Sequence, residues 1–550
     1  MQEVPSAMSV SNVSTWVIIS IVVLFLLLIP GIDHGLWGPD EPRVAGICAG
    51  MARTNDYIVP HLNGKPFLEK PPLYYAVAAV SGSLLSVGGD VPYRLVSLLF
   101  AVLTIIAACA IASHRDGVVT GIIAGGILAS SVGFFMLSRQ VQVDIALVFG
   151  VVLAMYAYLE AVDSSSAKYS IVLGFAVGIS FMAKGFIGPA LIAASIMIDT
   201  LRRRNLAIVW RIKPQFIIMC MGIIVVPWII ALWDRGGWAF LREAIVVNNL
   251  MRFTGAPEGA ALGHQHGPLY YFIRFPLGFL PWTLLFIPAF ISSLKNFRND
   301  PYLSWFIGPF LLLAAASTKR GIYLVPLYPA AACMTAQWFA QARYMKWDNF
   351  LVKITWGIAV AGCFVPFAGI FLGIPVTGLI LAILALSSMA LITRFRMKHI
   401  GTLPLVLIMS IALTANAFVY YTYMKPHKDY LGFARQAMAI AGSKEIVMLS
   451  PNEAMRGVLP LVTGNKHRVV SSPDDIRENG IYIWADKDDS ILRSLKQRAG
   501  VEILLERKMI YSGCRTARLA IISGIHGSDA RSRGEGMASS TQFIRTASYE

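Results

Sequence analysis

The sequence predicts a polytopic α-helical membrane protein. Of its 550 residues, 56% are hydrophobic and only 14% are charged, and the mean hydropathy is +0.62. A bilayer-spanning helix needs about 20 mostly apolar residues, because lipid cannot satisfy backbone hydrogen bonds. Such runs recur between residues 16 and 423. These values exclude a soluble globular protein of ordinary composition.

The net charge of +16 is the other global feature of the chain. A basic chain can bind nucleic acid, but here Arg and Lys lie largely in short loops between apolar runs, as the positive-inside bias explains. We therefore expect no nucleic-acid partner. The arginine triplet at residues 202–204 is the strongest marker of a cytoplasmic loop.

Counting the apolar runs against this bias predicts thirteen spans, with the N-terminus cytoplasmic and the C-terminus external. The first run has no A-x-A-like site after it and no basic segment before it, so we expect an anchor rather than a cleaved signal peptide. Residues 43–54 and 73–87 are expected to form helices at the membrane interface, with a tight turn at Asn63-Gly64 between them. The expected spans are 16–32, 94–112, 118–137, 145–162, 169–183, 186–198, 216–233, 269–291, 302–316, 322–338, 354–372, 377–392 and 403–423.

The composition changes after residue 423 to that of a soluble domain. Helix-like patterns at 431–441 and 491–498 alternate with β-rich runs at 445–449, 480–484 and 501–505, which predicts a small α/β domain. Residues 524–550 are mostly Gly, Ser, Ala and Arg and are expected to be disordered. The predicted domains are therefore 1–423, 424–523 and the tail 524–550.

Two carboxylates are expected outside the membrane on the same face. Asp40 lies in the first polar segment after the first span, beside Glu41, and Asp144 precedes a span. Asp144 alone can be read as a helix cap favoured by the helix dipole. Two carboxylates converging above a bundle suit a cationic or polyhydroxylated substrate, or general-base work.

Several cations also lie at external ends of spans or in the two long external loops. For any one of them, snorkelling toward headgroups is a sufficient explanation. Six cations on the external side are not what the positive-inside bias predicts. Binding of an anionic ligand such as a phosphate would explain all of them together. These cations are Arg43, Lys70, Lys184, Arg252, Lys319 and Arg320.

Other candidate site residues are less specific. Glu69, His264 and His266 have the N/O donors of a divalent metal site, zinc first, but solvated or hydrogen-bonded histidines explain the same pattern. Tyr323 and Tyr328 are placed either to hydrogen-bond a ligand or to lie in the aromatic belt. Neither a Walker A loop nor a dinucleotide fingerprint is present, so nucleotide chemistry has no support.

Five motifs together resemble a known family. They are WGPDEPR at 37–43, VPHLNGKPFLEKPPLYY at 59–75, QVQVD at 140–144, AKG at 183–185 and STKRGIYLVPLYP at 317–329. The chain resembles the GT-C class of polyprenyl-phosphate-sugar glycosyltransferases, and within it the lipid A aminoarabinose transferases. The resemblance covers residues 14–423 and implies thirteen spans with an external C-terminal domain.

The resemblance implies an enzyme of the bacterial inner membrane with its site facing the periplasm. The donor would be undecaprenyl phosphate carrying 4-amino-4-deoxy-L-arabinose, the acceptor a lipid A phosphate, and the result polymyxin resistance. Carried over by motif, Asp40, Asp144 and Lys70 are catalytic, and Lys70 holds the donor phosphate. The implied lining residues are Arg43, Glu69, Lys184, Arg252, Lys319, Arg320 and Tyr328.

Such an enzyme requires no cofactor, apart from the metal already considered, and we expect a monomer among membrane lipids. A GT-C transferase with another polyprenyl-phosphate sugar or a protein acceptor, as in O-mannosyltransferases, is the alternative within the class. A secondary transporter is the alternative outside it. A transporter should show inverted repeats and charges at the bilayer midplane, whereas these spans are nearly free of charge.

Overall fold

The computed structural model describes residues 28–85, 89–251, 254, 266–267, 269–341, 346–367, 369, 373, 383, 386, 402–476, 480–486, 490–498, 501–512 and 515–524. Contacts divide the chain into two compact units. The first contains Met1–Asp33, Asn55–Pro60 and Pro66–Tyr423. The second contains His34–Thr54, His61–Lys65 and Met424–Glu550.

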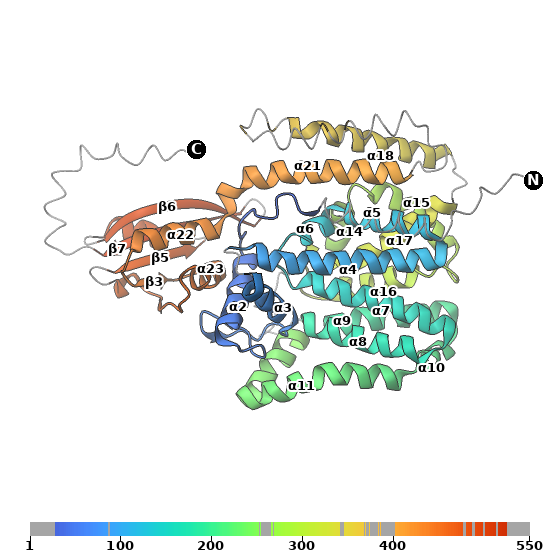
Figure 1. Cartoon of the computed structure of the whole chain (residues 1–550), viewed down its shortest axis with the longest axis horizontal. Helices are drawn as coiled ribbons and strands as arrows, with labels where there is room; N and C mark the ends of the chain where they lie inside the picture. Colours follow the sequence, from blue (N-terminus) through green and yellow to red (C-terminus); the bar gives the residue numbers. More distant parts are fainter. Residues whose placement is uncertain are drawn as a thin grey trace, which may run out of the picture. The chain divides into compact units, whose positions relative to one another are not determined.

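The first unit is a helical bundle. Helices α4, α7, α8 and α11 pack side by side in that order (Figure 1). Glycines let neighbouring backbones approach closely: a Cβ on Gly308 of α16 would overlap the backbone of Ala194 in α9. The longer helices are α4 (Val91–Asp116), α5 (Val118–Ala129), α7 (Asp144–Ser164), α8 (Ala167–Lys184), α9 (Ile187–Arg203), α11 (Pro214–Leu241), α16 (Leu303–Ala315), α17 (Tyr328–Gln341), α18 (Lys346–Phe364) and α21 (Thr402–Lys428).

Within the described residues, six helices are long and apolar enough to cross a membrane, or seven if one bent pair is counted as a span. The shorter apolar helices α3 (Leu73–Leu85), α5 and α16 lie outside that set. The predicted spans at 16–32 and 377–392 lie mostly or wholly outside the described residues. The chain is thus mostly helical with several apolar helices, and the number thirteen stays a prediction.

Three predicted spans differ from the structure because local chemistry interrupts them. The span 269–291 is a pair of helices, α14 (Tyr270–Gly278) and α15 (Thr283–Lys295), bent by 116°. Pro281 lies in the break and has no N–H to continue a helix.

The other two interruptions are milder. Helix α5 ends at Ala129, where the hydroxyls of Ser130 and Ser131 donate to Gly126 O at 2.5 Å and Leu128 O at 2.8 Å, and the short α6 (Val132–Leu137) follows. The span 322–338 begins as a 3-10 helix, η2 (Gly321–Leu327), before α17. Helix α11 also carries a non-helical residue, Gly237, with φ 57°.

The second unit contains the first polar segment. Helix α2 (Asp40–Thr54) begins three residues before the predicted helix, and strands β1 (His61–Leu62) and β2 (Lys65–Pro66) flank the predicted turn. Asn63 and Gly64 have φ values of 51° and 78°, as a tight hairpin turn requires. The Asn63 amide also exchanges two hydrogen bonds of 2.8 Å with the backbone of His467.

A five-stranded sheet of order β4-β3-β5-β7-β6 forms the rest of this unit. Strand β3 pairs in parallel with β4 and β5, whereas β7 pairs antiparallel with β5 and β6. Val447, Tyr482, Trp484 and Leu492 lie in its buried core. The elements are α22 (Tyr430–Ala441), β3 (Ile446–Leu449), α23 (Glu453–Thr463), β4 (Val469–Val470), η4 (Pro473–Asp475), β5 (Ile481–Asp486), α24 (Ser490–Lys496), β6 (Val501–Ser512) and β7 (Arg515–Gly524).

The predicted helices and strands of this region overlap α22, β3, β5, α24 and β6, whereas α23 and β7 have no predicted counterpart. The second unit combines residues 34–54 and 61–65 with the residues from 424 onward, so it is not one continuous stretch of chain. A separate domain that consists of residues 424–523 alone stays a prediction. The predicted tail at 524–550 lies outside the described residues except for Gly524.

Candidate active site

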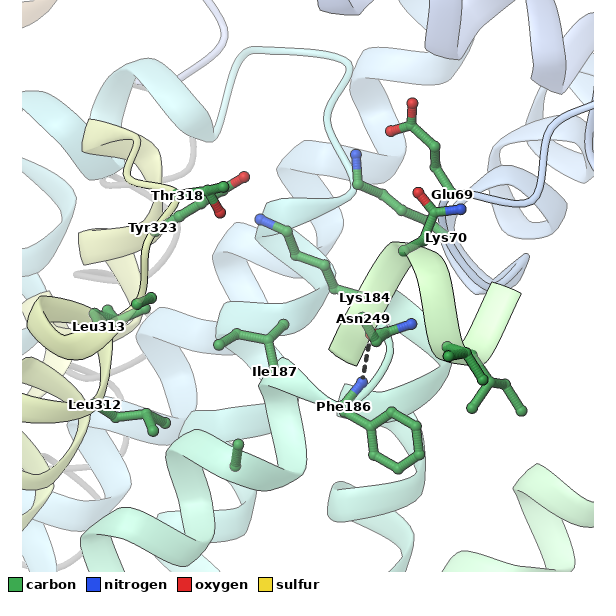
Figure 2. A pocket seen from close by; sticks show the side chains of 15 residues that line it. Glu69, Lys70, Lys184, Phe186, Ile187, Asn249, Leu312, Leu313, Thr318 and Tyr323 are labelled. Carbon is green, nitrogen blue, oxygen red and sulfur yellow. Dashed lines mark hydrogen bonds between the residues drawn. The ribbon is translucent and has the colours of Figure 1, made fainter. Parts of the chain in front are cut away.

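A cavity of about 550 Å³ lies in the first unit, and its walls come from four separate stretches of the chain, 69–70, 184–190, 245–249 and 312–323 (Figure 2). Its polar lining residues are Glu69, Lys70, Lys184, Asn248, Asn249, Thr318 and Tyr323. Its apolar lining residues are Phe186, Ile187, Ala190, Ile245, Val246, Leu312, Leu313 and Ala316. A cavity that combines two lysines and other polar groups with many apolar side chains fits an amphiphile with an anionic head.

Lys184 is the central charge of this cavity. In Figure 2 its side chain extends toward Thr318 and Tyr323, while Glu69 and Lys70 come from the other side. The Lys184 Nζ forms an ion pair with Asp144 and lies 4.0 Å from the centroid of the Tyr323 ring. A buried ammonium is tolerated only when such partners replace water.

Local structure places this pair. Asp144 is the first residue of α7 and Lys184 is the last residue of α8. A carboxylate at a helix N-terminus and an ammonium at a C-terminus are each stabilised by the helix dipole. Asp144 therefore pairs with Lys184, one of the predicted cations, and it also lies at a helix N-terminus, as the helix-cap interpretation requires.

A π-helix, η1 (Arg242–Met251), holds the turn after Lys184 in place through a hydrogen bond. Phe186 N donates to Asn249 Oδ1 at 3.0 Å, the bond drawn in Figure 2, and Asn249 Nδ2 donates to Ala244 O at 2.7 Å. Gly185 has φ 74°, and a Cβ there would overlap the Asn249 side chain. Neither asparagine of η1 was among the predicted site residues. Their signal was a tandem Asn in a long external segment, which is weak alone.

The segment 317–329 delivers one predicted ligand residue to the cavity. Tyr323 lines it, whereas Tyr328 is 2% exposed, and its ring packs 5.7 Å from the rings of Phe275 and Phe279. Lys319 is buried and donates to Ala316 O. Arg320 N donates to Tyr271 Oη at 3.3 Å. The described cavity lining includes none of Tyr328, Lys319 and Arg320.

Asp40 and Arg43 belong to the second unit. Arg43 Nη2 lies 2.7 Å from Asp40 Oδ1, and Arg43 Nη1 lies 2.5 Å from Glu453 Oε2. Glu41 accepts a hydrogen bond of 2.9 Å from Trp37 N. Because Asp40 and Asp144 lie in different units, their convergence stays a prediction.

The predicted metal site is only partly described. His264 lies outside the described residues, Glu69 lines the cavity, and the exposed His266 ring stacks on the Tyr270 ring with 4.2 Å between their centroids. The predicted cation Arg252 also lies outside the described residues. Within the described residues no three His, Cys, Asp or Glu side chains gather as metal ligands. The zinc site stays a prediction.

Comparison with known proteins tests the predicted resemblance. A family model described as dolichyl-phosphate-mannose-protein mannosyltransferase matches residues 69–231. An undecaprenyl phosphate-alpha-4-amino-4-deoxy-L-arabinose arabinosyl transferase of Edwardsiella ictaluri is 26% identical over 59% of this chain and 59% of that protein. A protein of the same description, numbered 2, from Pseudomonas fluorescens is 28% identical over 60% of this chain and 57% of that protein. The predicted resemblance is confirmed.

Solved structures give the fold. ArnT from Cupriavidus metallidurans bound to undecaprenyl phosphate matches with a TM-score of 0.73 and 18% identity, covering 93% of this chain and 98% of that one. The archaeal oligosaccharyltransferase AglB from Archaeoglobus fulgidus matches with a TM-score of 0.50 and 13% identity, covering 88% and 70%. The fold is therefore of the GT-C type. The sequence matches span less than two thirds of the two transferases' own length.

Proposed function

We propose that this chain is an integral-membrane glycosyltransferase that moves 4-amino-4-deoxy-L-arabinose from undecaprenyl phosphate to a lipid A phosphate. The observation that carries the proposal is the cavity that combines Lys70 and Lys184 with an apolar wall. An anionic head bound to the lysines and a polyprenyl tail along Ile187 and Leu312 match this division. The names of the similar transferases supply the sugar and the lipid carrier.

The reaction needs positive charge where the leaving group forms. An oxygen of the acceptor phosphate attacks the anomeric carbon of the sugar, and the bond from that carbon to the donor phosphate breaks. Undecaprenyl phosphate then leaves as a monoester and gains negative charge. Lys70 is assigned to this charge, with Arg252 and Arg320 as further cations, because interactions that strengthen in the transition state accelerate the step.

The carboxylates have a different task. A phosphate acceptor is already ionised at neutral pH, so Asp40 need not act as a base toward it. We assign Asp40 and Asp144 to binding the ammonium of the sugar and orienting the acceptor, with general-base action as the second reading.

The proposed setting is the bacterial inner membrane, with thirteen spans and with the site and the C-terminal unit facing the periplasm. The protein acts as a monomer among membrane lipids, and the less negative outer surface protects the cell against polymyxin. A related transferase with another polyprenyl-phosphate sugar or a protein acceptor is the second candidate. The match to a mannosyltransferase model over residues 69–231 favours it.

Lipid A mass spectrometry separates the two candidates. Cells expressing the wild-type chain should contain lipid A with an added aminopentose, which should be missing without the gene. Asp40→Asn and Lys70→Ala should each abolish this product and polymyxin protection while the protein stays in the membrane. Unmodified lipid A in cells that express the wild-type chain and supply the donor would reject the proposed acceptor.

A further inference from the structure

We propose that Glu453 of the C-terminal region is a positioning residue that acts on the first polar segment through Arg43. This inference rests on the proposed function, in which Asp40 binds the ammonium of the sugar. Glu453 lies 410 residues along the chain from Arg43, yet its carboxylate accepts a 2.5 Å hydrogen bond from the Arg43 guanidinium. The inference gives α23 a task in sugar transfer.

The backbone on both sides of this contact is tightly held. Helices α2 and α23 meet at Gly46 and Gly457, where a Cβ on Gly46 would overlap Gly457 O and a Cβ on Gly457 would overlap Pro42 O. Close packing of this kind leaves little freedom to slide. Asn452 caps α23 by accepting a hydrogen bond of 2.9 Å from Met455 N, so Glu453 is held in the first turn.

The Arg43 guanidinium donates hydrogen bonds to two carboxylates, each through a different nitrogen. Arg43 uses Nη2 toward Asp40 and Nη1 toward Glu453, which fixes the plane of its rigid fork. The side chains of Arg43 and Asp40 are 8% and 11% exposed, whereas that of Glu453 is 49% exposed. The buried pair is therefore oriented by a carboxylate at the edge of the unit.

Charge sharing gives the contact a chemical consequence. The three side chains Asp40, Arg43 and Glu453 carry one positive and two negative charges, a net charge of about −1 between them. With Glu453 taking part of the Arg43 charge, Asp40 keeps more negative potential toward a cationic group such as the sugar ammonium. Without Glu453, Arg43 can rotate to bind Asp40 with both Nη atoms, which would turn the Asp40 oxygens and neutralise them.

The test is a double-mutant cycle in the full-length protein reconstituted in membranes. Glu453→Gln keeps the shape and removes the charge, and we expect sugar transfer to lipid A to fall about 10-fold. Glu453→Asp should restore most of the rate, because it keeps an anionic acceptor. In an Arg43→Lys background, Glu453→Gln should have little further effect, since one ammonium cannot link both carboxylates.

The matched control is Asp474→Asn, which removes another carboxylate of the same unit. Asp474 is 84% exposed at its side chain and pairs with Arg498 at 2.9 Å, so its loss should leave the rate unchanged. An equal loss of rate from Glu453→Gln in both backgrounds, or wild-type rates in Glu453→Gln, would overturn the inference. Absence of product from the wild-type chain would instead overturn the proposed function.

Discussion

Lys184 ends α8 and forms an ion pair with Asp144, which begins α7, so that this contact joins the adjoining ends of two neighbouring helices. The side chains of Lys184 and Asp144 are only 10% and 8% exposed. Lys184 lines the cavity, and the ion pair also contributes to the packing of α7 against α8. Loss of the pair should therefore reduce both the stability of the protein and the rate of sugar transfer.

Lys184→Met tests this coupling. It leaves the Asp144 carboxylate buried without its ammonium, so we expect the free energy of unfolding to fall by about 3 kcal/mol or more, with loss of transfer activity. The double variant Asp144→Asn/Lys184→Met should be less destabilised than Lys184→Met, because it leaves no lone charge. Thermal unfolding of the detergent-purified protein measures both.

A surface pair supplies the control for this measurement. Arg235 lies 2.8 Å from Asp56 with its side chain 45% exposed, so Arg235→Met should cost at most about 1 kcal/mol. A larger cost for Arg235→Met than for Lys184→Met would show that burial does not set the importance of these pairs.

Gly185→Ala tests the clamp on the Lys184 turn. The change strains a residue with φ 74° and places a methyl group against Asn249, so we expect a loss of about 2 kcal/mol in stability and a misplaced Lys184 with lower transfer activity. Gly117→Ala is matched for strain, because Gly117 has φ 93° and a Cβ added there would meet nothing within 4 Å. Equal activity in the two variants would argue against the clamp.

Gly46→Ala tests the close contact between α2 and α23. The added methyl group would overlap Gly457 O, so we expect destabilisation of about 1–3 kcal/mol from forced separation of the helices. Gly50→Ala, in the same helix, meets only His61 O at 3.6 Å and should stabilise by up to about 1 kcal/mol. Opposite signs for the two glycines in thermal unfolding are the expected result.

The second unit should lose stability on acidification through His467. Burial lowers the pKa of His467 from its ordinary value of 6.5, although its hydrogen bond to Ile446 O opposes the change. The unfolded chain then binds more protons between the two pKa values, so stability is complete above about pH 6.5 and falls as the pH drops through the folded pKa.

His467→Gln is the variant that isolates this effect. Its unfolding free energy should depend less on pH below 6.5 than that of the wild type, because the titrating group is gone. Urea unfolding from about pH 7.5 to about pH 5 measures the difference. A steeper acid dependence in the variant would contradict the assignment to His467.

Local features were the ones that sequence reasoning found. The apolar runs that became α4, α7 and α8 are recognisable because each helix carries its own hydrophobic pattern. The turn at Asn63-Gly64 was predictable because left-handed backbone there depends on two adjacent residues. Among the predicted site residues, Glu69, Lys70, Lys184 and Tyr323 line one cavity.

The sequence alone could not predict how helices and side chains pack against distant parts of the chain. The 116° bend at residues 279–282 could not be predicted, because Pro281 marks the interruption of the helix without setting the angle between its two halves. Tyr323 and Tyr328 lie in the same segment, but Tyr323 lines the cavity whereas Tyr328 packs against Phe275 and Phe279. A pattern that treats both tyrosines alike cannot separate them.

By itself, the sequence determined a chain of apolar helices with charged ends and a separate run of strands and helices after residue 423, since these properties follow from the hydrophobicity of contiguous residues. Only the tertiary structure decided that Lys184 meets Asp144, that Asn249 holds the turn after Lys184, and that Glu453 meets Arg43. Those contacts join distant segments, and their geometry depends on helix packing, which no local pattern encodes.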